Sequence, residues 1–85
     1  MLNVKPNVQK FIELLTEKDR RIVGEYISRL EGDWPPGGDL EKLYDHRFRL
    51  HISRRYTLFI EHEGNDTTVL RIMTIEQAHK RYGRI

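Results

Sequence analysis

The sequence predicts an α+β fold: an N-terminal strand and a helical hairpin packed on one face of an antiparallel sheet, followed by a short C-terminal helix or tail. Apolar residues recur at helical spacing before residue 31 and alternate with polar residues after residue 46. A loop rich in proline and glycine, residues 31–39, separates these halves. Helices grouped on one face of an antiparallel sheet are typical of α+β domains.

The first half is expected to hold a short edge strand and two helices. Residues 2–5 form the strand, which Pro6 closes, and Asn7 is the expected N-cap of the first helix. Thr16, with Asp19 three residues on, marks the start of the second helix, and Gly32 marks its end. Both helices have an apolar face, formed by Val8, Phe11, Ile12 and Leu15 in the first and by Ile22, Val23, Tyr26, Ile27 and Leu30 in the second.

The second half is expected to form three antiparallel strands. In residues 47–52, Phe48, Leu50 and Ile52 alternate with Arg47, Arg49 and His51, so this strand has one apolar and one cationic face. Residues 53–55 form a turn, residues 56–61 the next strand, residues 64–66 another turn and residues 67–74 the third strand. Residues 75–82 form a short helix or turn that Gly83 stops.

Length and composition bound the classes of protein. A chain of 85 residues makes one domain, residues 1–85, and 38% hydrophobic residues suffice for a core. The absence of cysteine excludes disulfides and thiolate metal sites. No apolar run reaches the roughly 20 residues of a membrane helix, and the N-terminus lacks the apolar segment of a signal peptide. We therefore expect a cytoplasmic protein without a membrane partner.

The charge is unevenly divided along the chain. Residues 1–45 hold seven Lys/Arg and nine Asp/Glu, a net charge of −2, whereas residues 46–85 hold eight Lys/Arg and four Asp/Glu, a net charge of +4. All four histidines also lie in the second part. Arginine binds phosphate with two parallel hydrogen bonds, so this bias favours an anionic partner. The alternative is an ordinary solvated, charge-rich surface.

Nearly the whole chain resembles the RelE/ParE superfamily of toxins from toxin–antitoxin pairs. The resemblance rests on Leu40-Glu41-Lys42-Leu43, on Arg47-Phe48-Arg49-Leu50, on Tyr56 at the start of an apolar strand and on Val69-Leu70-Arg71-Ile72. It implies the RelE-like fold described above and a toxin that a cognate antitoxin protein silences. The RNA-cleaving branch has an arginine after the strand-opening tyrosine, and here that place is Thr57. The later His-Arg pair of the family falls on Thr74 and Ile75, and its tail tyrosine on His79.

The resemblance implies a ribosome-dependent, metal-independent mRNA endonuclease with the ribosome and mRNA as partners. Because the family's arginine is replaced by Thr57, the catalytic set would have to be rebuilt from other residues. Histidine suits proton transfer near neutral pH, and arginine suits the charged phosphorane. The candidate catalytic residues are therefore His51, His79, Arg49 and Arg71. The candidate RNA-binding residues are Arg47, Arg54, Arg55, Lys80, Arg81, Tyr82 and Arg84, with Tyr82 expected to stack on a base.

Several alternatives remain open at this point. Thr57 favours a non-nuclease ParE-type toxin, which acts by holding a protein target such as DNA gyrase, or a catalytically dead member that binds the antitoxin. Arg49 and Arg71 could instead pair across strands with Glu61 or Glu63. We expect no cofactor and no metal site, since His46 and His51 lie on opposite faces of a strand and the glycines of the loop do not join a strand to a helix. Trp34 is expected to anchor the loop.

Overall fold

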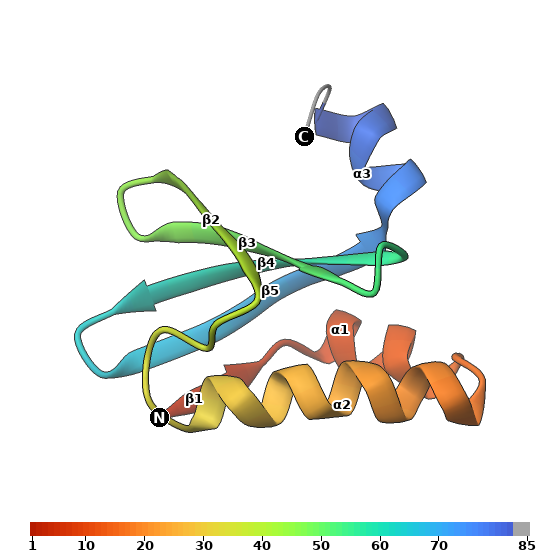
Figure 1. Cartoon of the computed structure of the whole chain (residues 1–85), viewed down its shortest axis with the longest axis horizontal. Coiled ribbons are helices and arrows are strands. Elements are labelled where there is room, and N and C mark those ends of the chain that lie inside the picture. The colour runs from red at the N-terminus through yellow and green to blue at the C-terminus, as the bar shows by residue number, and fades with distance from the viewer. Residues whose placement is uncertain (83–85) are drawn as a thin grey trace.

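The computed structural model describes the backbone of residues 1–82 and the side chains of residues 1–78. The elements follow one another as β1 (Leu2–Val4), α1 (Pro6–Glu13), α2 (Glu17–Glu31), β2 (Asp39–Tyr44), β3 (Arg47–Ile52), β4 (Tyr56–Glu63), β5 (Asp66–Thr74) and α3 (Ile75–Tyr82). The sheet has five strands in the order β1-β5-β4-β3-β2. Helices α1 and α2 lie on one side of this sheet, and α3 rises from its other side (Figure 1). The predicted α+β class is therefore confirmed.

Two features of the sheet differ from the prediction. The sheet is mixed rather than purely antiparallel, because β1 runs parallel to β5, with Asn3 beside Thr68. Strand β2 was not predicted, and it pairs with β3 to form the second edge of the sheet. The alternation that reveals a half-buried strand is missing from β2, since only Leu40 among its residues is partly buried. An edge strand needs only one neighbour, so backbone pairing suffices to place it.

The predicted start of one N-terminal helix is wrong, and that of the other is confirmed. The predicted N-cap Asn7 is wrong: the N-cap is Lys5, two residues earlier, and α1 begins at Pro6, whose fixed φ suits the first helical position. Asn7 instead donates a hydrogen bond to the carbonyl oxygen of Leu70 at 3.3 Å. The prediction for α2 is confirmed, because the Thr16 hydroxyl accepts from the backbone N–H of Asp19 and Gly32 caps the other end.

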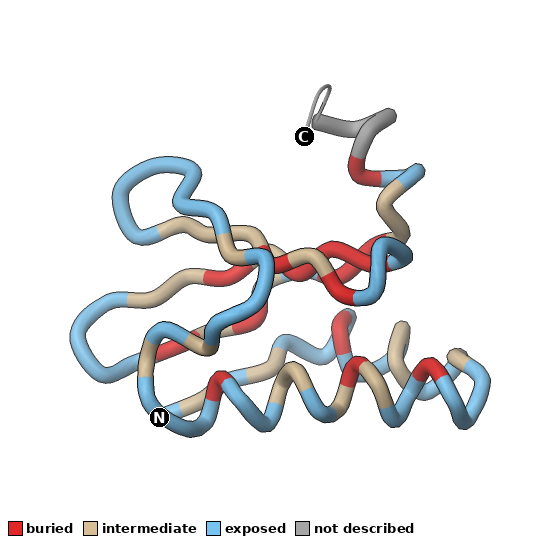
Figure 2. Tube along the Cα trace, viewed as in Figure 1, coloured by how far each residue is buried: buried red, intermediate tan, exposed pale blue. Residues whose placement is uncertain are grey.

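The core lies between the sheet and the two N-terminal helices. Its fully buried strand residues are Leu50, Ile52, Leu58, Ile60 and Val69, and the helices contribute Val8 and Val23. Figure 2 shows the buried positions of α2 turned toward the sheet and its exposed positions turned away. These apolar residues follow the spacings expected of a helix face and of alternating strands, so burial fixes which sheet face the helices cover.

One buried carboxylate joins the helices to the sheet. The side chain of Asp19, at the start of α2, is only 6% exposed. Its oxygens accept hydrogen bonds from the Tyr56 hydroxyl at 2.6 Å and from Nη1 of Arg55 at 2.9 Å. The hydrogen bond to Asp19, followed by burial and by the charge of Asp19, raises the pKa of Tyr56 above its ordinary value of 10.0. The neutral phenol is therefore the form that the fold stabilises.

Removal of the Tyr56 hydroxyl should destabilise the protein. Tyr56→Phe leaves the buried Asp19 carboxylate without its closest donor, and hydrogen bonds to charged groups contribute about 1.5–3 kcal/mol. We expect a loss of about 2 kcal/mol in the free energy of unfolding, measured by urea denaturation. Tyr26→Phe is the matched control, because the Tyr26 hydroxyl has no hydrogen-bond partner within the described residues. A loss as small as that of the control would contradict this role of Asp19.

The raised pKa of Tyr56 also predicts a pH dependence. Since the folded pKa lies above the unfolded value, the stability linked to Tyr56 is fully present below about pH 10 and is lost as the pH rises through the folded pKa. Urea denaturation of the wild type and of Tyr56→Phe across this range isolates the effect. The stability difference between the two proteins should shrink above pH 10, and a constant difference would contradict the prediction.

Candidate functional site

The sheet face opposite α1 and α2, here called the outer face, carries the predicted cationic residues. Alternation on β3 places Arg47, Arg49 and His51 on this face, because Phe48, Leu50 and Ile52 turn toward the core. The register then sets Arg49 opposite Phe59 on β4, and Phe59 opposite Arg71 on β5. Directly opposed residues share a face. Three of the four candidate catalytic residues, Arg49, His51 and Arg71, thus lie on one surface.

Arg49 is the least accessible of these cations. Its side chain is 11% exposed, and its Nε and Nη2 donate to one carboxylate oxygen of Glu41 at 3.1 and 2.6 Å. Glu41 belongs to β2 and lies directly opposite Arg49 in the sheet. The sequence suggested Glu61 or Glu63 as a partner for Arg49, and this is wrong because β2 was not expected. Glu61 pairs with Arg47 instead, at 3.2 Å.

Arg71 differs from Arg49 in both exposure and pairing. Its side chain is exposed, and it makes no hydrogen bond or ion pair with any residue whose side chain the structure describes. The alternative partners Glu61 and Glu63 therefore do not hold Arg71 either. Strands that are two apart in a sheet lie about 10 Å from each other, so Arg49 and Arg71 flank Phe59 without touching. Arg71 is the cation of the central row that is left for a ligand.

His51 is oriented by a neighbour in the sheet. Its Nδ1 lies 3.0 Å from the Thr57 hydroxyl, and Thr57 is fully buried. One ring nitrogen is thus occupied, which orients the ring, and Nε2 has no hydrogen-bond partner among the described side chains. Thr57 thus supplies a buried hydroxyl that positions the histidine.

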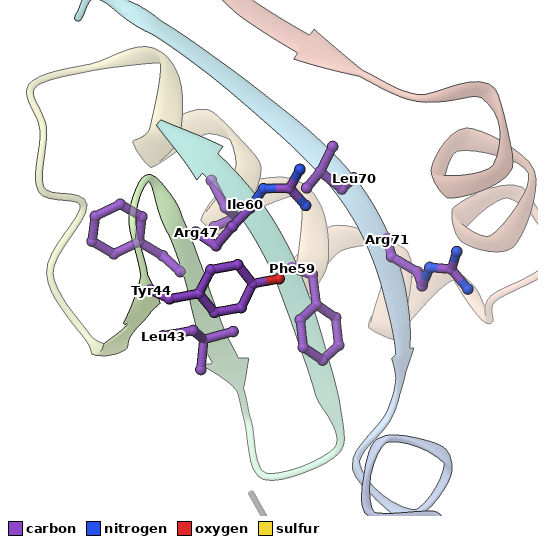
Figure 3. Close-up of a pocket in the computed structure, with 8 residues that line it drawn as sticks. Leu43, Tyr44, Arg47, Phe59, Ile60, Leu70 and Arg71 are labelled. Atoms are coloured by element: carbon purple, nitrogen blue, oxygen red, sulfur yellow. The ribbon is translucent and has the colours of Figure 1, made fainter. Parts of the chain in front are cut away.

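A cavity of about 370 Å³ opens on the outer face between the β2–β3 hairpin and β5. Figure 3 shows the Tyr44 ring near Phe59, with the guanidinium of Arg47 directed toward Leu70. A β-bulge between Phe59 and Ile60 shifts the register with β5, so that Ile60 pairs with Val69 and Leu70 is the extra residue. Tyr44 is 63% exposed. The lining is mostly apolar or aromatic, with two arginines: Leu43, Tyr44, Arg47, Phe48, Phe59, Ile60, Leu70 and Arg71.

The sequence did not single out Leu43, Tyr44 or Phe59 as site residues. Leu43 and Tyr44 lie at the irregular end of β2, where the pairing with β3 shifts register. One sequence feature could have revealed a hairpin at this point. Asp45 follows an aromatic residue, and aspartate tolerates the left-handed conformation of a tight turn. Asp45 has a φ of 43° and connects β2 to β3. Read as a turn, it would have predicted a hairpin with Tyr44 beside Arg47.

Arg54 and Arg55 do not line the cavity. Arg54 and Arg55 lie in the β3–β4 turn, where Arg55 pairs with Asp19. The side chains of His79, Lys80, Arg81 and Tyr82 lie outside the described residues, as does all of Arg84, although residues 75–82 do form the helix that was one expected outcome for the tail.

The other two histidines have neighbours of their own. His46 lies 3.6 Å from a carboxylate oxygen of Glu63. His62 stacks on Trp34, with ring centroids 3.9 Å apart, and its Nδ1 lies 2.7 Å from the Thr67 hydroxyl. Trp34 also contacts the Phe48 ring and packs against the core, which confirms it as a loop anchor.

Comparison of the chain with protein-family models, curated proteins and solved structures yields no match. Within the described residues, no helix is long and apolar enough to cross a membrane. The same residues contain no group of three or more metal-ligating side chains. The described part of the outer face combines two arginine–glutamate pairs, the unpaired Arg71 and a cavity with aromatic lining.

The two arginine–glutamate pairs of the outer face should differ in strength. Arg49–Glu41 is mostly shielded from water on the arginine side, whereas the side chains of Arg47 and Glu61 are each 41% exposed. Double-mutant cycles with glutamine substitutions should give a coupling of about 1–2 kcal/mol for Arg49–Glu41 and below about 1 kcal/mol for Arg47–Glu61. Urea denaturation measures both. Equal couplings would show that the Arg49 pair is screened like a surface pair.

Proposed function

We propose that this protein is a RelE-like toxin that cleaves mRNA on the translating ribosome without a metal, and that a cognate antitoxin in the cytoplasm silences it. The observation that carries the proposal is the row Arg49–Phe59–Arg71 across three strands of the outer face. The row sets the unpaired Arg71 at a cavity that also contains the exposed ring of Tyr44. A cation near an exposed aromatic ring matches a nucleotide, which has an anionic phosphate and a flat base.

The described side chains suggest how RNA would bind. Arg71 is unpaired within the described residues and can hold a phosphate through its planar guanidinium. Tyr44 offers an exposed ring beside the cavity, and a base can stack on such a ring whatever its identity. Arg47 contributes a second cation near the cavity. This division, with the phosphate on Arg71 and the base in the cavity, makes RNA a better fit than an isolated anion.

Cleavage requires two proton transfers. The ribose 2′-oxygen attacks the adjacent phosphorus as a base removes its proton, and the 5′-oxygen leaves as an acid protonates it. The products are a 2′,3′-cyclic phosphate and a free 5′-hydroxyl, so water is not a reactant in this step. His51 supplies one of these groups through Nε2, and His79 is our candidate for the other. Arg71 stabilises the additional negative charge of the phosphorane. Arg49 is neutralised by Glu41 and lies farther from water.

The antitoxin is expected to act on the same surface. An acidic segment laid over Arg47 and Arg71 would neutralise the cations that RNA needs. Such a segment could also add a strand to the free edge of β2, which lies beside the cavity. Inhibition would then follow from occupation of the site.

A second function, that of a ParE-type toxin acting by protein binding, is favoured by one observation. Glu41 already neutralises Arg49, and the place of the family's catalytic arginine is occupied by the buried Thr57. Among the side chains that the structure describes, the outer face then offers one histidine and one unpaired arginine near the cavity. Such a surface can bind an acidic protein target without catalysing any reaction.

Cleavage of mRNA by the pure protein, in EDTA and with or without translating ribosomes, tests the proposal. Loss of a group that stabilises transition-state charge typically lowers the rate about 10²–10³-fold, so we expect Arg71→Gln to fall in this range. Loss of a proton-transfer group costs about 10²–10⁴-fold, which is the expectation for His51→Gln. Arg21→Gln is the matched control, because Arg21 lies on α2, on the other side of the sheet.

The outcomes separate the two functions. Ribosome-linked cuts that persist in EDTA and are lost in Arg71→Gln support the endonuclease. No cutting by a folded wild-type protein that still inhibits growth would overturn the endonuclease and leave the protein-binding toxin. Cutting at the wild-type rate by both Arg71→Gln and His51→Gln would show that the outer face is not the catalytic site.

A further inference from the structure

The β3–β4 turn has an unusual backbone for its sequence. Ser53 and Arg54 both have positive φ angles, 51° and 58°. The backbone N–H of Arg55 donates to the carbonyl oxygen of Ile52 at 3.0 Å and closes a turn around these two residues. The turn lies within the three-residue connection between the paired residues Ile52 and Tyr56. Two consecutive left-handed residues define the type I′ turn, in which asparagine and glycine are strongly preferred. Ser-Arg is a poor choice there, because each Cβ lies too close to the following carbonyl oxygen.

The surrounding structure holds this turn in place. Arg55, the next residue, is fixed to Asp19 at 2.9 Å. The carbonyl oxygen of Arg55 also accepts the backbone N–H of Ile75, at the start of α3, at 2.9 Å. The turn is therefore tied to α2 through a side chain and to α3 through the backbone. Strained residues persist where neighbouring structure determines them in this way, and they concentrate at functional positions.

The two adjacent arginines of this segment have different roles. Arg55 pairs with a carboxylate whose side chain is only 6% exposed, so its charge is neutralised within the fold. Arg54 is exposed and makes no hydrogen bond or ion pair with any residue whose side chain the structure describes. Arg54 therefore has a strained backbone, and its charge does not stabilise the described part of the fold through an ion pair. Glycine would relieve the strain, and the only property that it would lose is the guanidinium.

We infer that Arg54 is a phosphate contact for the backbone of single-stranded RNA, located beyond the cavity at the end of β3. This inference rests on the proposed function. Strand β3 carries Arg49 and His51 toward the turn, and Arg54 is the second residue of that turn, five residues after Arg49. An RNA strand seated on the outer face and extended along β3 reaches this turn. The contact is to phosphate, so it is independent of sequence.

Three substitutions separate charge from strain. Ser53→Gly relieves strain and keeps the charge, Arg54→Gln removes the charge and keeps the strained backbone, and Arg21→Gln removes a charge from α2. Binding of a short unstructured RNA, followed by fluorescence anisotropy over a range of salt concentrations, measures the number of phosphate contacts. Each contact to a single strand contributes about 0.7 to the slope of log K against log salt. Urea denaturation measures the stability of each variant.

We expect Arg54→Gln to lower the salt slope by about 0.7 and to leave the urea midpoint near that of the wild type. Ser53→Gly should raise the midpoint and leave the slope unchanged. Arg21→Gln should change neither. A wild-type slope in Arg54→Gln, or an equal fall in Arg21→Gln, would overturn the inference even if mRNA cleavage were intact. RNA binding without cleavage would overturn the endonuclease alone, whereas a wild-type protein that binds no RNA would overturn both.

Discussion

The burial of one carboxylate determines how the two layers of this protein meet. Asp19 lies where α2 begins, and its charge is balanced by the Arg55 guanidinium and the Tyr56 hydroxyl from the β3–β4 hairpin. A buried carboxylate without such partners would cost several kcal/mol, so the helix start and the hairpin end must come together. The apolar residues of α1 and α2 can then cover only one face of the sheet, and the outer face lies on the side from which α3 rises.

The arginines of the outer face differ in whether a neighbouring carboxylate neutralises them, and this matters more than how many there are. Alternate residues of a strand lie about 7 Å apart on one face, so Arg47 and Arg49 would repel each other if both were free. Glu61 and Glu41, from the strands on either side of β3, neutralise them one by one. Arg71 and Arg54 have no such partner within the described residues. The unpaired positions, and not the net charge of the chain, mark where an anion can bind.

The sequence predicts the elements that burial determines. The helices and strands β3, β4 and β5 have apolar residues at regular spacing, and the structure contains each of them. Strand β2 has no such pattern because it lies at an edge and buries little. The partner of Arg49 was missed for the same reason. The bulge at Phe59 depends on pairing between strands, which no local pattern records, so the cavity that includes Tyr44 and Leu70 could not be predicted either.

Thr57 determines how His51 is held on the outer face. Arginine at this position would carry a charge into a place that is fully buried here, whereas the threonine hydroxyl needs only one hydrogen-bond partner, which His51 provides. The histidine is thereby held with one nitrogen occupied and the other available. In the site that we propose, the oriented histidine does the proton chemistry and Arg71, on the next strand but one, supplies the charge. Since the two lie on different strands, the rigidity of the sheet fixes their separation.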